Sequence, residues 1–179
     1  LAYFWLQSDS ELIFVGDSGA TEASDGSERS GLELALFWEL NSNWVLDLTG
    51  SIVDSKFVGV DAEADHIPNA HGRVISMGLT RAPVLGWNWS MRVRHFGDAA
   101  LVEDDSINYP STTIINMGLS YKTDRWTAGV DLFNLADSEH YDIAYWYSSR
   151  LSSEVSSVED IHFHPVNPRS IRMGLEYRF

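Results

Sequence analysis

Two histidines separated by one residue, His162 and His164, form the clearest group of side chains in this sequence that could do chemistry. Residues at positions i and i+2 of an extended segment face the same side, so both imidazoles could contact one metal ion or metal chelate. His140, Glu159 and Asp160 lie in the same polar stretch and could join them as ligands. The alternative is that the histidines simply pack within a polar loop. We favour this alternative and assign no metal site.

Flat aromatic side chains accompany these histidines. Such rings bind ligands at a low cost in conformational entropy, although they also pack within loops or contact lipid headgroups. The predicted ligand-binding set therefore joins three histidines to four aromatic residues: His140, Tyr141, Tyr145, Trp146, Tyr147, His162 and His164.

Composition and motifs exclude several other kinds of chemistry. The 179 residues contain no cysteine, which excludes disulfides, thiolate zinc sites and cysteine nucleophiles. No nucleophile elbow, zinc-protease histidine pair or phosphate-binding glycine loop occurs, so we expect neither an enzyme nor a bound cofactor. The formal net charge of −14 argues against a nucleic-acid partner, because phosphate binding requires clustered Lys and Arg. The acidic run 103–105 lacks the spacing of an EF-hand calcium loop and is better explained as a solvated loop.

The elements that must position these residues are β-strands, because apolar and polar residues alternate through most of the chain. In residues 32–40 every even position is Leu or Trp, whereas the odd positions are Glu, Ala, Phe and Glu. Six further segments alternate in the same way, the last being residues 171–179. Residues 1–15 are expected to form one long bulged strand, or two strands joined by a turn at 8–10. The sequence thus predicts about eight strands.

The connections between these strands are alternately short and long. Short turns are expected at residues 41–43, 82–86 and 122–124, and long polar loops at residues 16–29, 54–70, 97–110 and 136–168. Short turns at one rim and long loops at the other are typical of outer-membrane β-barrels, whose strands cross the hydrocarbon layer at a tilt. The four loops hold 18 acidic and 3 basic residues. This acidic end could concentrate cations or cationic chelates, bind divalent ions, or simply keep the loops solvated.

Charges within the strands indicate which face of the sheet meets lipid. Three charged residues lie in mid-strand: Arg92, Arg94 and Asp131. Burying these charges in the dry interior of a β-sandwich would cost free energy, so we predict that they face a barrel lumen. The alternate apolar residues would then face the membrane. Aromatic residues close to the short turns or to the chain end fit a ring at the membrane interface: Trp38, Trp44, Trp87, Tyr121, Trp126 and Phe179.

Several motifs together resemble the C-terminal part of the barrel of TonB-dependent outer-membrane receptors. Residues 130–137 (VDLFNLAD), followed by Tyr141, are similar to the NLFD…Y stretch near the end of those receptors. Residues 30–34 (SGLEL) resemble their recurring GxE strand start, and residues 172–179 (RMGLEYRF) resemble their final strand. Residues 92–97 (RVRHFG) and the acidic loop after them are similar to a strand and loop of the same receptors.

The resemblance implies an all-β fold, a transmembrane antiparallel meander β-barrel whose strands here are the C-terminal portion of a larger barrel of about 22 strands. Residues 1–179 would form a single barrel domain or barrel segment, without a plug domain. The resemblance also implies the outer membrane of a Gram-negative bacterium and energy-coupled uptake of a siderophore, cobalamin or a similar large solute. The implied partners are outer-membrane lipid, the plug domain, the TonB system and the barrel assembly machinery, which recognises a closing aromatic residue such as Phe179.

Two alternatives remain open from the sequence. One is a self-contained eight-stranded outer-membrane barrel with a structural or adhesive role. The other is a soluble β-barrel or sandwich that binds a small apolar molecule inside. Pairing of the first strand with the last would indicate the small barrel, and apolar strand faces packed together at a dry centre would indicate the soluble protein.

Overall fold

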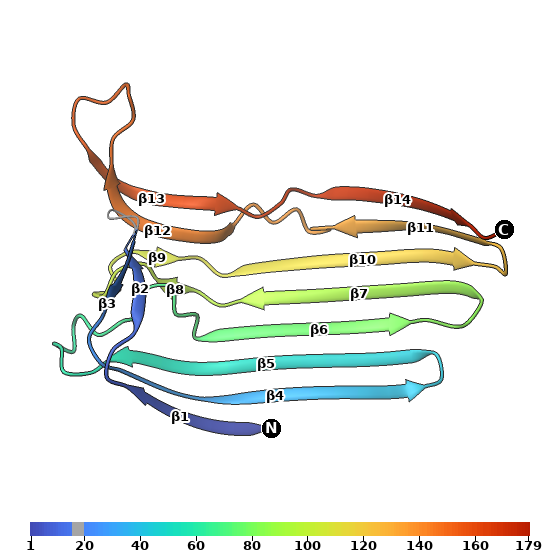
Figure 1. Cartoon of the computed structure of the whole chain (residues 1–179), viewed down its shortest axis with the longest axis horizontal. Helices are drawn as coiled ribbons and strands as arrows, with labels where there is room; N and C mark the ends of the chain where they lie inside the picture. The colour runs from blue at the N-terminus through green and yellow to red at the C-terminus, as the bar shows by residue number, and fades with distance from the viewer. Residues whose placement is uncertain (16–19) are drawn as a thin grey trace.

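Alternating apolar and polar residues form one antiparallel sheet of eight long strands in the computed structural model, which describes residues 1–15 and 20–179 (Figure 1). Each long strand pairs with the next long strand along the chain, so the predicted all-β meander is confirmed. In sheet order the strands are β1 (Ala2–Ser8), β4 (Ser27–Asn41), β5 (Trp44–Phe57), β6 (Arg73–Arg81), β7 (Gly86–Phe96), β10 (Thr112–Lys122), β11 (Trp126–Phe133) and β14 (Ser170–Tyr177).

The long connections contain three small antiparallel sheets that the alternation of the main strands does not predict. The paired strands are β2 (Leu12–Val15) with β3 (Ala20–Ala23), β8 (Ala99–Ala100) with β9 (Asn108–Tyr109), and β12 (Tyr141–Ser149) with β13 (Val158–Pro165). All three pairs lie at the same end of the main sheet (Figure 1). The predicted long loops are therefore partly ordered into strands. Within the first loop, residues 16–19 lie outside the described residues.

The opening segment departs from both arrangements that the sequence predicts. β1 ends at Ser8 and pairs with β4, whereas β2 pairs with β3 in a different sheet, so residues 1–15 form neither one bulged strand nor a hairpin. Two hydrogen bonds between Glu11 and Ser24 join the chain next to this small sheet. The Glu11 N–H donates to Ser24 Oγ at 3.1 Å, and the Ser24 N–H donates to the Glu11 carbonyl at 2.8 Å.

The two faces of the main sheet differ in polarity as the alternation predicts. On one face, Leu34, Met173 and Leu175 are 41%, 79% and 70% exposed. On the other face, Asp47 of β5 and Arg92 of β7 lie on either side of Gly78 of β6, since each is its partner in the strand register. Large apolar side chains therefore lie along an uncovered surface instead of packing at a dry centre, which argues against the soluble alternative.

Aromatic rings gather near the short connections of the main sheet. Trp87 on β7 lies against Tyr121 on β10 with ring centroids 5.0 Å apart, and Trp126 on β11 lies 4.4 Å from Tyr177 on β14. All four residues lie within a few positions of the end of their strand at this rim. Amphipathic rings in a row of this kind suit the interface between a membrane and water.

β1 and β14 form the two edges of the main sheet (Figure 1). Within the described residues these strands do not pair with each other, so the eight strands form an open sheet and not a closed eight-stranded barrel. The pairing that the self-contained small barrel requires is thus not observed. Separately, no helix in the described part of the chain is long and apolar enough to cross a lipid bilayer.

Candidate ligand-binding site at the loop end

A cavity of about 820 Å³ lies at the end of the main sheet where the long connections gather. We name it the loop cavity. Five segments that are far apart in the chain contribute to its lining: residues 11–13, Arg29, and parts of residues 64–69, 101–106 and 145–146. Its volume is within the range of sites that take small-molecule ligands. The site is therefore a product of the loop arrangement and not of any single motif.

One wall of the loop cavity is an ion pair between Glu11 and Arg29. Arg29 Nη2 and Nε donate to the Glu11 carboxylate at 2.6 and 3.1 Å, and the Ser27 hydroxyl donates to the same carboxylate. The hydrogen bond from Arg29 is the main cause that holds the pKa of Glu11 below its ordinary value, against a smaller opposing effect of burial. Glu11 is therefore ionised at neutral pH and Arg29 is engaged by it.

Two further acidic residues, Glu103 and Asp104, come from the connection between β8 and β9. Ser106 donates to the Asp104 carboxylate twice, from its hydroxyl at 2.6 Å and from its backbone N–H at 3.1 Å. These hydrogen bonds hold the pKa of Asp104 below its ordinary value. Within the part of the chain that the structure describes, the lining of the loop cavity thus contains three acidic side chains and one basic side chain.

A small hydrophobic cluster holds β12 beside β8 and β9. Leu101, Tyr109 and Ala144 are buried in it, and Trp146 packs against it. Tyr109 Oη donates to the Tyr141 carbonyl at 2.6 Å, which joins β9 to the start of β12. Burial raises the pKa of Tyr109, so the phenol keeps its proton and remains a donor. The cluster thereby sets the position of the aromatic residues on β12.

The motif of residues 130–137 forms contacts on both sides of the β12–β13 ribbon, where the chain leaves the main sheet and returns to it. Asn134 adopts a left-handed backbone with φ of 49°, which asparagine tolerates. Its side-chain amide donates to the carbonyls of Ser138 and Asn167, each at 2.9 Å. Arg169 Nη2 also contacts the Asp137 carboxylate at 2.8 Å. The segment before β12 is therefore joined to the segment after β13, and the two strands leave the main sheet as one ribbon.

The four predicted aromatic residues occupy different surroundings. Tyr145 and Trp146 line the loop cavity. Tyr141 packs inward, with its ring stacked on Phe163 at a centroid distance of 4.1 Å. Tyr147 stacks on His162 of β13, with ring centroids 3.8 Å apart. Of these four, Tyr145 and Trp146 are the two whose position suits contact with a solute in the loop cavity.

The three predicted histidines make separate contacts. His162 Nε2 lies 3.2 Å from the Tyr147 carbonyl, and His164 Nδ1 lies 3.6 Å from the Asp142 carboxylate. His140 is exposed, and its carbonyl accepts a backbone hydrogen bond at 3.1 Å. Among the residues that the structure describes, no group of three His, Asp or Glu side chains is arranged to hold a metal ion. The metal-ligand set considered from the sequence is therefore not assembled.

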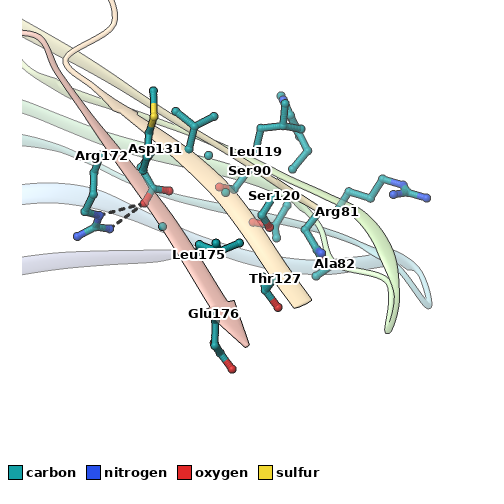
Figure 2. Close-up of a pocket in the computed structure, with 18 residues that line it drawn as sticks. Arg81, Ala82, Ser90, Leu119, Ser120, Thr127, Asp131, Arg172, Leu175 and Glu176 are labelled. Carbon is teal, nitrogen blue, oxygen red and sulfur yellow. Dashed lines mark hydrogen bonds and ion pairs between the residues drawn. The ribbon is translucent and has the colours of Figure 1, made fainter. Parts of the chain in front are cut away.

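The residues predicted to face a lumen, Arg92, Arg94 and Asp131, lie on the polar face of the main sheet. Arg92 contacts Asp47 at 2.9 Å, and Arg172 contacts Asp131 at 2.9 Å along the hollow of about 500 Å³ drawn in Figure 2. Arg94 borders another cavity, of about 670 Å³, close to the loop end. That this face lines the lumen of a barrel stays a prediction.

Sequence reasoning missed most of the loop cavity. Glu11 and Arg29 are 18 residues apart and belong to segments predicted as strand and loop, so nothing in their spacing marks them as a pair. Glu103 stands out in the sequence only as part of an acidic run. One usable signal was the presence of large apolar residues within polar loops. Ile67 and Leu101 are such residues, and both are only 5% exposed.

Comparison with known proteins bears on both the fold and the family. The sequence matches the family described as "TonB dependent receptor-like, beta-barrel" over residues 1–135. No protein with a curated description matches the chain. The family match covers most of the main sheet, from β1 through β11.

Solved structures of similar fold include two receptors and a transporter. The ferric yersiniabactin uptake receptor FyuA from Yersinia pestis aligns with 88% of this chain and 25% of its own, with a TM-score of 0.65 and 17% identity. The siderophore receptor PiuA from Acinetobacter baumannii aligns with 98% and 25%, with a TM-score of 0.69 and 14% identity. The copper transporter OprC aligns with 99% and 28%, with a TM-score of 0.62 and 14% identity. The chain therefore spans about a quarter of the length of these proteins.

The family match and the fold agree with the motifs noted in the sequence. An eight-stranded antiparallel meander with an exposed apolar face is what a segment of such a barrel wall should look like. The family comprises receptors and transporters, not enzymes. This chain belongs to the TonB-dependent receptor family and forms part of its β-barrel.

Proposed function

We propose that this chain is part of an outer-membrane receptor of a Gram-negative bacterium that takes up a siderophore, cobalamin or a similar large solute. The loop cavity is the observation that carries the proposal, since it lies where the long connections gather and its volume of about 820 Å³ is within the range of small-molecule sites. Tyr145 and Trp146 provide rigid aromatic surface for it. The names of the similar structures, a ferric yersiniabactin uptake receptor, a siderophore receptor and a copper transporter, support a metal-containing solute.

The two faces of the sheet take different roles in this proposal. The apolar face meets outer-membrane lipid, and the polar face with Arg92, Arg94 and Asp131 lines the lumen beside a plug domain. β1 and β14 pair with further strands of a larger barrel, because an unpaired strand edge within lipid leaves backbone N–H and C=O groups without partners. The TonB system supplies the force that rearranges the plug, and Phe179 closes the strand that the assembly machinery recognises.

Metal uptake by whole cells tests the proposal. Cells carrying the intact receptor and cells lacking its gene are grown with iron, copper or cobalamin limiting, and cell-associated iron, copper and cobalt are measured by mass spectrometry. We expect the deletion to lower uptake of one of these metals. Tyr145→Ala combined with Trp146→Ala should lower the same uptake about tenfold, because buried aromatic anchors dominate binding energy.

The control for this experiment alters the same ribbon outside the loop cavity. Leu151 and Val155 are 66% and 98% exposed, and they lie between β12 and β13. Leu151→Ala combined with Val155→Ala should leave uptake unchanged. Equal uptake of all three metals by the deletion strain and the parent strain would contradict the proposed function.

A further inference from the structure

Among the described residues, the lining of the loop cavity carries net negative charge, and its one cation is held in an ion pair. Its acidic residues are Glu11, Glu103 and Asp104, and its basic residue is Arg29. Arg29 makes two hydrogen bonds to Glu11, at 2.6 and 3.1 Å, and an anionic solute would have to break them to use this guanidinium. Glu103 and Asp104 form no ion pair within the described residues. Their two charges are therefore the ones that a bound solute would meet.

The surrounding loops extend this negative field beyond the cavity. The four loops predicted from the sequence, residues 16–29, 54–70, 97–110 and 136–168, hold 18 acidic and 3 basic residues. On the polar face of the main sheet, in contrast, acidic and basic side chains occur together, and two such pairs are Arg92 with Asp47 and Arg172 with Asp131. Charges of one sign around a concave site raise the local concentration of oppositely charged solutes. The excess negative potential is thus concentrated at the loop end.

The remaining lining of the loop cavity is apolar or aromatic. Leu12, Ile67 and Leu101 supply aliphatic surface, and Tyr145 and Trp146 supply rings. Such surface favours a solute that has its own apolar or aromatic portion to remove from water. The faces of Tyr and Trp rings also attract cations. The acidic and the aromatic parts of the lining both favour a cation, and the aliphatic part favours an apolar portion on the same solute.

We propose that the loop cavity selects solutes that carry net positive charge beside an apolar or aromatic portion, and that it discriminates against polyanionic chelates. This inference rests on the proposed function and specifies the charge class of the solute. An anionic chelate would approach Glu103 and Asp104, and no unpaired basic side chain among the described lining residues would compensate its charge. A cationic chelate would replace part of the hydration of these carboxylates with its own charge.

Two ruthenium complexes with the same frame and opposite charge test this selection. Tris(2,2′-bipyridine)ruthenium(II) is an aromatic dication, and the derivative with two carboxylates on each bipyridine is a tetra-anion at neutral pH. Binding of each complex to the purified intact receptor in a neutral detergent is measured by equilibrium dialysis, with empty micelles as the blank. We expect the dication to bind at least about tenfold more tightly, and the difference to shrink as salt rises, because salt screens charges.

Substitutions in the loop cavity test whether its carboxylates cause the preference for the dication. Glu103→Gln combined with Asp104→Asn should weaken binding of the dication about tenfold. The matched control, Glu139→Gln combined with Glu159→Gln, removes the same charge from exposed positions that do not line the loop cavity. It should change either affinity less than about twofold. Reversal by Glu103→Lys with Asp104→Lys should produce a preference for the tetra-anion, a gain that a misfolded receptor cannot show.

Equal affinity of the intact receptor for the two complexes, including no binding of either, would overturn the proposed selection. A control pair that weakens dication binding as much as the cavity pair would overturn it as well. Neither result changes the metal uptake that separates the parent strain from the deletion strain. Failure of the charge selection is therefore distinguishable from failure of the proposed function.

Discussion

Glu11 and Arg29 form the contact that joins the segment between β1 and β2 to the start of β4. Ion pairs on an open protein surface contribute little to stability, because water screens them. This pair is more sheltered, since the Arg29 and Glu11 side chains are 28% and 23% exposed. It also keeps Arg29 from presenting a free positive charge to the loop cavity. The pair thus influences both the order of the loops and the charge that a solute meets.

Acid is expected to loosen this contact. Arg29 is the main cause that holds the pKa of folded Glu11 below the unfolded value of about 4.3. The stabilisation is therefore fully present above that unfolded value and is lost as the pH falls through the lower, folded pKa. Pepsin cleavage within β2 of the intact receptor should be slower than in the Glu11→Gln variant at about pH 5, and should approach the variant's rate by about pH 2. A ratio of the two rates that stays constant with pH would contradict this role of Glu11.

At the scale of the strand, β4 lies unusually close to its neighbours at Gly31. A Cβ atom at this position would collide with the Ile52 carbonyl oxygen of β5 and would lie 3.0 Å from the ring of Phe4 on β1. Backbone atoms of a paired strand cannot move aside as the end of a flexible side chain can. The glycine at this strand start is therefore required by the packing of three strands.

Gly31→Ala is expected to lower the free energy of unfolding of the intact barrel by about 1 to 3 kcal/mol, because β4 and β5 must shift to admit the methyl group. The comparison is Gly50→Ala on β5, between two paired strands, where the nearest atom to a Cβ would be the Val74 carbonyl oxygen at an ordinary contact distance of 3.7 Å. That change should alter the free energy of unfolding by less than about 0.5 kcal/mol. Urea unfolding in lipid vesicles, followed by tryptophan fluorescence, measures both. Equal effects of the two substitutions would rule out this account of Gly31.

At the scale of the whole molecule, the two faces of the main sheet must meet different surroundings. Exposed apolar side chains run along one face, whereas the other carries charged side chains, among them the Arg92–Asp47 and Arg172–Asp131 pairs. In water, so much exposed apolar surface would favour aggregation, and in a membrane it contacts acyl chains. Neighbouring positions on one strand should therefore respond in opposite ways to the same charged substitution.

Leu34 and Ala35 provide this comparison, since they are adjacent near the middle of β4 and both are exposed. Leu34→Arg should lower the free energy of unfolding in lipid vesicles by about 2 to 4 kcal/mol, because it places a guanidinium among acyl chains. Ala35→Arg, on the polar face, should change it by less than about 1 kcal/mol. A larger loss for Ala35→Arg than for Leu34→Arg would show that the assignment of the faces is reversed.

Local residue patterns were sufficient to predict the main sheet. Side chains two positions apart share a face of a strand, so the alternation of residues 32–40 placed Leu34 on the apolar face correctly. The short turn predicted at residues 41–43 lies between β4 and β5. The prediction was wrong for residues 1–15, where Glu11 bonds to Ser24 and Arg29, 13 and 18 residues further along the chain, and alternation within a strand does not reveal such contacts.

By itself, the sequence determined the long strands, the polarity of their faces and the end of the sheet where acidic loops gather, because each of these depends on residues that are near neighbours in the chain. Only the tertiary structure decided which loop residues share a cavity. Tyr145 and Trp146 come to line it together with Glu11, whereas His164 turns toward Asp142. These contacts join segments separated by more than a hundred residues or fold a ribbon back on itself. Packing between separate loops determines these contacts, and the alternation of residues within a strand does not predict them.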